Sequence, residues 1–258
     1  MRNAPLKKVN SKLQFNPSLS LRISRTTKIN NFAICFIVLI FELCILSCTC
    51  YATPCYGTKM PKKNRFFAGF GSYSIFKRYL EDNFGKLRSQ QQFFLLSYGV
   101  TDWFSIDLKS GGGSIRQHPV GSGEIHYTSS FAGGYGLRLK FFDKDNVKMV
   151  FGFQHISVHP KSTHLGDVKN KAILDDWQTS LLISRGFKRI TPYLGTRWSR
   201  LDYIHRVGDD RKRRMSDMTR DIGLIYGFDI PITEKFWINL EGQAFDSDAF
   251  AASINYAF

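Results

Sequence analysis

The stretch Phe131-Ala132-Gly133-Gly134-Tyr135-Gly136-Leu137-Arg138-Leu139-Lys140-Phe141 alternates between two kinds of side chain. The odd positions carry Phe, Tyr and Leu together with Gly133, whereas the even positions carry Ala, Gly, Arg and Lys. Successive side chains of a β-strand point to opposite faces, so this period of two predicts a strand with one apolar and one polar face. A strand of a soluble sheet can show the same pattern, and the assignment therefore depends on how often the pattern recurs.

The alternation recurs along the chain at 147–154, 221–230 and 236–241. In each segment the apolar face is large and the polar face is small or charged, as a barrel in lipid requires when its polar face lines an enclosed lumen. No apolar segment after residue 52 approaches the length of a transmembrane helix. We expect ten strands, near 65–76, 90–100, 103–109, 127–142, 147–157, 174–187, 190–206, 218–230, 235–245 and 249–258.

The connections between these strands give an independent indication of topology. Long and short connections alternate, with long ones predicted at 77–89, 110–126, 158–173 and 207–217. Outer-membrane barrels have short periplasmic turns and longer outer loops. In hydrocarbon every backbone N–H and C=O must be paired within the protein, which requires a closed sheet. The predicted fold is therefore all-β, a closed antiparallel up-and-down transmembrane β-barrel of about ten strands, with eight or twelve remaining possible.

The first 52 residues have the composition of a helical signal segment. Residues 1–31 are basic and contain no acid, residues 32–47 are apolar except for Glu42, and small residues follow. A basic region, a short apolar core and small residues are typical of an export signal. Cleavage after Ala52 or lipid attachment at Cys48 fits this pattern, and an uncleaved anchor is the alternative. We expect a leader over 1–52, a short periplasmic linker over 53–64 and the barrel over 65–258.

Charge and cysteine content indicate the environment of the chain. The net charge is +15, and seven basic residues and one acid lie in residues 1–52, so the remainder keeps a basic surplus. Such a surplus suits anionic lipid headgroups. Nucleic acid is not an expected partner, because no recognised binding motif is present. All five cysteines lie within the first 55 residues, and a chain that crosses an oxidising periplasm benefits from having few thiols.

The chain end resembles that of bacterial outer-membrane β-barrel proteins. Phe258 is terminal, and Phe250, Ile254 and Tyr256 share its face of the last strand. The stretch Tyr98-Gly99-Val100-Thr101-Asp102-Trp103-Phe104 is similar to a hairpin common in these barrels. The resemblance implies location in the outer membrane of a Gram-negative-type bacterium after signal-directed export, and recognition of the last strand by the barrel-assembly machinery.

One short motif carries candidate chemistry. His155 and Ser157 are two residues apart and so share a strand face, where a histidine can act as the general base of a serine. This His-x-Ser resembles the motif of outer-membrane lipid A deacylases, which implies Ser157 as nucleophile and His155 as base. The sequence departs from that family after Ser157, where Val158 stands in place of Asn, and Asp167 is the nearest substitute for its Glu.

Other interpretations remain open at this stage. His155, His159 and His164 could instead form a metal site or a solvated loop, and no cofactor or metal is expected. The charges predicted to line the lumen are Asp107, Arg138, Lys140, Lys148, Asp221, Asp229 and Glu241, and the basic run Arg211-Lys212-Arg213-Arg214 could bind lipopolysaccharide phosphates.

The expected function is a non-enzymatic barrel in envelope structure, surface interaction or limited small-solute passage. The alternatives are a lipid A deacylase-like esterase and a soluble periplasmic binding barrel. The sequence leaves the oligomeric state open.

Overall fold

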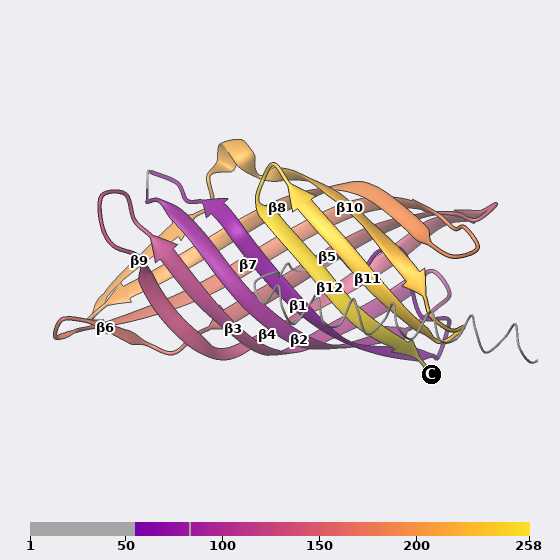
Figure 1. Cartoon of the computed structure of the whole chain (residues 1–258), viewed down its shortest axis with the longest axis horizontal. Coiled ribbons are helices and arrows are strands. Elements are labelled where there is room, and N and C mark those ends of the chain that lie inside the picture. The colour runs from indigo at the N-terminus through magenta and orange to yellow at the C-terminus, as the bar shows by residue number, and fades with distance from the viewer. Residues whose placement is uncertain (1–54, 83) are drawn as a thin grey trace, which may run out of the picture. The chain divides into compact units, whose positions relative to one another are not determined.

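The computed structural model describes residues 55–82 and 84–258, so the predicted signal segment, Ala52 and Cys48 lie outside the described residues. Ten strands close into an antiparallel barrel, because β1 pairs with β12 and β7 pairs with β8. The prediction of a closed ten-stranded barrel is confirmed (Figure 1). The wall strands are β1 (Phe66–Tyr79), β2 (Lys86–Gly99), β3 (Phe104–His118), β4 (Ile125–Lys144), β5 (Val147–His159), β7 (Val168–Arg185), β8 (Thr191–Val207), β10 (Ile222–Pro231), β11 (Phe236–Ala244) and β12 (Asp248–Ala257).

Two short strands extend the wall at one rim. β6 (Thr163–Leu165) pairs with β7, and β9 (Asp210–Met215) pairs with β8. A single 3-10 turn, Met218–Arg220, follows β9. Among the described residues, no helix combines the length and the hydropathy needed to cross a bilayer.

The outer connections are shorter than the sequence predicted. β3 continues through the predicted loop 110–126 as far as His118, and β7 already begins at Val168. In these outer segments the outward positions are polar while the inward positions carry buried apolar side chains such as Ile115 and Leu174, so the lipid-facing alternation stops but backbone pairing continues. His155 and His159 accordingly lie on β5 and His164 on β6, rather than in a solvated loop.

The two faces of the wall have the polarity that a bilayer requires. Phe70, Leu108 and Leu194 point outward and are 60%, 55% and 51% exposed. The inward face holds buried polar groups, among them Asp107 and Arg138. This is the fold of a bacterial outer-membrane β-barrel, with a band of large apolar side chains on its outward face. A second set of apolar side chains, among them Tyr127, Ile156 and Leu174, is buried inside the barrel.

The last strand shows its aromatic face to the outside. Ile254, Tyr256 and Phe258 are 43%, 41% and 59% exposed. Tyr256 and Phe258 contact each other edge to face, with 5.1 Å between ring centroids. Three of the four residues predicted to contact the assembly machinery therefore lie on an accessible surface at the end of β12, next to its seam with β1, whereas Phe250 is partly buried.

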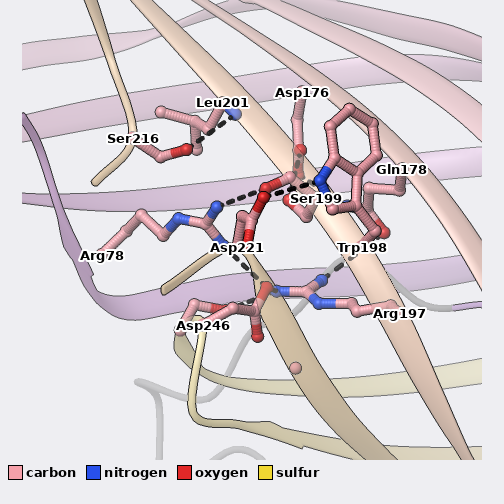
Figure 2. A network of polar contacts seen from close by, with 12 residues as sticks. Arg78, Asp176, Gln178, Arg197, Trp198, Ser199, Leu201, Ser216, Asp221 and Asp246 are labelled. Carbon is pink, nitrogen blue, oxygen red and sulfur yellow. Dashed lines mark hydrogen bonds and ion pairs between the residues drawn. The ribbon is translucent and has the colours of Figure 1, made fainter. Parts of the chain in front are cut away.

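Paired charges lie beside a buried apolar cluster in the outer half of the lumen. Asp246, in the connection between β11 and β12, accepts from Arg78 Nη1 at 2.7 Å and pairs with Arg197 Nη2 at 2.6 Å. Arg78 also donates to the backbone oxygen of Ser199, and Arg197 donates to Ser247 Oγ (Figure 2). Both arginines and Asp246 are almost completely buried. Burying such charges is tolerable only when they are paired and hydrogen-bonded, so this arginine–aspartate cluster closes the barrel.

The first described residues occupy the other half of the lumen. The Cys55 N–H donates to both carboxylate oxygens of Glu241, at 3.0 and 3.1 Å, and Arg138 Nη1 donates to the Lys59 backbone oxygen. Gly57 has φ of +62°, and a side chain there would begin 2.8 Å from Asp229 Oδ2. We call residues 55–59 the luminal segment. It lies within the stretch 53–64 that the sequence predicted as a linker.

The predicted lumen charges divide between the interior and the rim. Asp107, Arg138, Asp229 and Glu241 are buried inside, as expected. Lys140 pairs with Asp143 near the turn that follows β4, and Lys148 is partly exposed at the mouth of the barrel. Asp221 was wrongly assigned to the lumen: its carboxylate accepts from Trp198 Nε1, and the Trp198 ring lies on the outward face. The reason is that β10 begins only at Ile222, so Asp221 does not follow the alternation.

Candidate active site on the outward wall

The outward faces of β5 and β7 change character along their length. Near the start of β5, Met149, Phe151 and Phe153 point outward, and Leu181 and Ile183 do so on β7. Further along β5 the outward positions carry polar side chains, namely His155, Ser157 and His159. The inward positions between them, Ile156 and Val158, are buried.

The pairing of β5 with β7 places an acid against this polar stretch. Ser157 is directly opposite Asp175, and His155 is directly opposite Trp177. Side chains of directly opposed residues share one face of the sheet and lie within contact distance. Asp175 therefore joins the outward face at the level of Ser157.

Ser157 sits between a carboxylate and an imidazole. Its Oγ donates to Asp175 Oδ1 in a short hydrogen bond and lies 2.8 Å from His159 Nε2. A serine has one hydroxyl hydrogen, so Oγ accepts from His159 when it donates to Asp175, and it can donate to His159 when Nε2 is unprotonated. The contact gives the hydroxyl a base within proton-transfer distance.

His155 belongs to the same cluster through Asp175. Its Nε2 lies 3.8 Å from Asp175 Oδ1, and its ring lies against Trp177 with 4.0 Å between centroids. The His155 side chain is 17% exposed and that of Asp175 is 25% exposed, so the pair is accessible from outside the barrel. We call His155, Ser157, His159 and Asp175 the wall cluster.

The wall cluster lies near the outer edge of the apolar band. The short turns of the barrel, which in this class face the periplasm, precede Val147 and follow Arg185. Ser157 and Asp175 are each ten residues from those ends. A strand tilted by about 40° advances about 2.5 Å per residue along the membrane normal, which places both residues about 25 Å from the periplasmic rim. The apolar band of such barrels is about 25 Å tall.

The structure separates the residues that the sequence proposed as a triad. His155 and Ser157 share the outward face, but the imidazole in contact with Ser157 is that of His159. Asp167 lies in the turn between β6 and β7 with an exposed side chain. Its place beside Ser157 is taken by Asp175, because strand pairing rather than distance along the chain selects the neighbour.

The sequence contains one indication that Asp175 could belong to the site. It occupies an outward-facing position of a strand whose neighbouring outward positions, Ile173 and Trp177, are apolar. A carboxylate on the outward side of such a strand is costly and is therefore a candidate functional position. Among the described residues, no group of three His, Cys, Asp or Glu side chains could hold a metal ion.

The basic run forms β9, and most of its members have acidic partners. Lys212 pairs with Asp210 at 3.1 Å, Arg213 pairs with Asp202, and Arg214 lies 3.5 Å from Asp82. Arg211 is exposed and has no carboxylate partner among the described residues. The four residues therefore differ in how free they are to bind an external anion.

Solved structures of outer-membrane proteins match this chain at low sequence identity. No family model and no curated protein sequence matches the chain. The outer membrane protease OmpT from Escherichia coli is 12% identical, covering 78% of this chain and 99% of OmpT with a TM-score of 0.39. The outer membrane channel from Pseudomonas putida F1 is 8% identical over 81% of this chain and 100% of the channel, with a TM-score of 0.42. Ail from Yersinia pestis is 8% identical over 76% and 99%, with a TM-score of 0.37. At such identities no activity carries over to this chain.

Proposed function

We propose that this barrel is an acyl-ester hydrolase that works on the outer end of its lipid-facing wall, with Ser157 as the nucleophile. The observation that carries the proposal is the position of Ser157 Oγ, in contact with both Asp175 and His159 on the outward face. A serine in contact with both a carboxylate and an imidazole is not required by the barrel fold, and this arrangement favours a chemical role.

The chemistry follows from the contacts of Ser157. Its Oγ attacks the carbonyl carbon of an ester while its proton moves to His159 Nε2. The tetrahedral adduct then collapses, the carbon–oxygen bond to the alcohol breaks, and the alcohol leaves with that proton. Water hydrolyses the resulting acyl-serine by the same proton route, which releases a fatty acid and restores the hydroxyl. Asp175 orients the serine by accepting its hydroxyl hydrogen bond.

The level of the wall cluster indicates the substrate class. A site near the edge of the apolar band faces the region where acyl chains join their headgroups. The resemblance of His155-Ile156-Ser157 to lipid A deacylases points to acyl esters of an outer-leaflet glycolipid. The proposal differs from that family pattern in two residues, because His159 takes the place of His155 as the base and Asp175 supplies the acid.

The decisive experiment compares Ser157→Ala with wild type. Each purified barrel is incubated with extracted outer-membrane lipid in detergent micelles, and released fatty acids are measured by mass spectrometry. We expect release by wild type and loss of at least about a thousandfold in the variant, since a nucleophile has no substitute. Ser72→Ala, which removes an outward hydroxyl from β1, is the matched control and should retain activity.

Heat-modifiable gel migration must be the same for all three proteins, so that a loss of activity is not a loss of folding. Equal release by wild type and Ser157→Ala would refute hydrolysis at this site.

The non-enzymatic role expected from the sequence is the alternative outcome of that test. Envelope structure or surface interaction would remain if no hydrolysis is found. Small-solute passage is less favoured, because the luminal segment and the buried pairs of Asp107 with Arg138 and of Asp246 with Arg197 occupy the interior. Single-channel recording of the wild-type barrel tests passage directly.

A further inference from the structure

A row of like charges crosses the outward wall above the wall cluster. Lys171 on β7 is directly opposite Arg206 on β8, and Arg206 is directly opposite Arg211 on β9. All three side chains are exposed. We call these three residues the cationic row.

The three charges lie on one face, the outer face of the barrel. Asn170 and Ala172, which flank Lys171, are buried on the inner face, so Lys171 points outward. Directly opposed residues in an antiparallel pair share a face, which places Arg206 and Arg211 on the same side.

Like charges placed directly opposite one another in a sheet repel and lower stability. The nearby acids on the strands are already engaged, and neither Asp167 nor Asp209, which lie in the adjoining turns, is within ion-pair distance of the row. Asp202 pairs with Arg200 and Arg213, Asp210 pairs with Lys212, and Asp175 contacts Ser157 and His155. In the described part of the chain, no carboxylate is paired with any member of the cationic row.

The position of the row indicates which anion it meets. Lys171 lies four residues beyond Asp175 along β7, which is about 13 Å along the strand and about 10 Å further from the membrane centre. The headgroup layer is about 5–7 Å thick on each side of the hydrocarbon core, so the row lies at its outer surface, and the long side chains reach the headgroup phosphates. Two arginines and a lysine are also the residue types that bind phosphate oxygens.

We propose that Lys171, Arg206 and Arg211 form a binding site for the phosphate groups of membrane lipid headgroups on the outer side of the barrel. The bound phosphate neutralises the row and fixes a phospholipid or phosphoglycolipid against β7, β8 and β9. The site stands independently of hydrolysis, although it would also hold a phosphorylated substrate above Ser157.

Nuclear magnetic resonance of the arginine side chains tests this site. The full barrel, carrying Ser157→Ala so that no ester is cleaved, is studied in zwitterionic micelles. It is titrated with dihexanoyl phosphatidic acid, with dihexanoyl phosphatidylcholine or with inorganic phosphate. We expect saturable shifts of the Arg206 and Arg211 Nε resonances with phosphatidic acid, and affinities at least tenfold weaker for the other two ligands.

Two charge-matched variants show where the ligand binds. Replacing Lys171, Arg206 and Arg211 together by Gln should weaken phosphatidic acid binding at least tenfold. Replacing Lys188, Arg189 and Lys235 by Gln removes three exposed cations from the periplasmic turns and should leave binding unchanged.

Each other result argues against the site. Absence of saturable shifts, or equal shifts with phosphatidylcholine, would overturn it. Inorganic phosphate binding as tightly as phosphatidic acid would show a site for a soluble anion instead of a lipid. The two proposals can fail separately. Phosphatidic acid binding without any fatty acid release by wild type would overturn hydrolysis alone, and fatty acid release without saturable binding would overturn the phosphate site alone.

Discussion

Two groups of arginines lie on opposite sides of the barrel wall, and only the inner group has carboxylate partners. Inside, Arg78 and Arg197 share the carboxylate of Asp246 and are excluded from solvent. Outside, Arg206 and Arg211 face each other without an acid and are exposed. A buried charge is stable only when it is paired within the chain, whereas an exposed charge is solvated by water and screened by salt, and it can still bind a ligand. The interior charges therefore hold the fold, and the exterior charges are available for function.

The largest expected effect is the loss of stability caused by Asp246→Ala, which tests the role of the interior charges. The substitution leaves the guanidinium groups of Arg78 and Arg197 buried with no shared carboxylate, which costs about 3–5 kcal/mol. Urea unfolding in micelles should show the loss, together with reduced heat-modifiable migration. Asp248→Ala, at the exposed start of β12, is the control. Unchanged stability would mean that the interior charges do not hold the fold.

The exterior should respond to substitution through activity instead of stability. His159→Ala removes the imidazole in contact with Ser157, and a lost general base lowers a rate by about 10²–10⁴-fold. His155→Ala should have a smaller effect, because His155 reaches Ser157 only through Asp175. Fatty acid release measures both variants, with equal urea midpoints as the control. A larger loss for His155→Ala would make His155 the base.

A further change tests the luminal segment. Glu241→Gln replaces a carboxylate that accepts from the Cys55 N–H and from Tyr193 Oη by an amide whose NH₂ cannot accept. Loss of these buried hydrogen bonds should lower stability by about 1–3 kcal/mol and loosen the segment. Urea unfolding measures the first effect and single-channel recording the second, with the exposed Glu234→Gln as control. A variant as stable as wild type would show that the carboxylate does not anchor Cys55.

The cationic row gives an effect of opposite sign. Without an anionic ligand, replacing Lys171, Arg206 and Arg211 by Gln should raise stability by up to about 1 kcal/mol, because like charges no longer oppose one another. Urea unfolding in zwitterionic micelles at low salt measures the gain, which should vanish when phosphatidic acid is present. A loss of stability in zwitterionic micelles would mean that these side chains support the wall directly.

The smallest expected effect concerns the outer connection after β9. Hydrogen bonds from the Thr219 hydroxyl and backbone N–H lower the pKa of Asp217 below its ordinary value. A lowered folded-state pKa gives stability that is present above the ordinary Asp pKa and is lost as the pH falls through the lowered value. The protection factor of the Thr219 amide, which is the intrinsic exchange rate divided by the observed rate at the same pH, should therefore fall at acidic pH. Asp217→Asn should remove the pH dependence, and an unchanged dependence would contradict this origin.

The sequence by itself determined the class of fold. Alternation such as that of Phe131–Phe141 identifies a strand with a lipid face and a lumen face, and its recurrence counts the strands. It also placed His155 and Ser157 on one face, because that relation lies within a single strand. Beyond the apolar band the outward positions are polar and glycines interrupt the pattern on β3, and the sequence therefore predicted loops where β3 and β7 continue.

Only the tertiary structure decided which residues meet across strands. Asp175 lies opposite Ser157 through the register of β5 with β7, and Lys171, Arg206 and Arg211 form a row through two further registers. The burial of Cys55 beside Glu241 likewise joins residues far apart in the chain. Such contacts follow from strand pairing and closure, which a local period of two does not encode, because it fixes the face of each residue but not its neighbour.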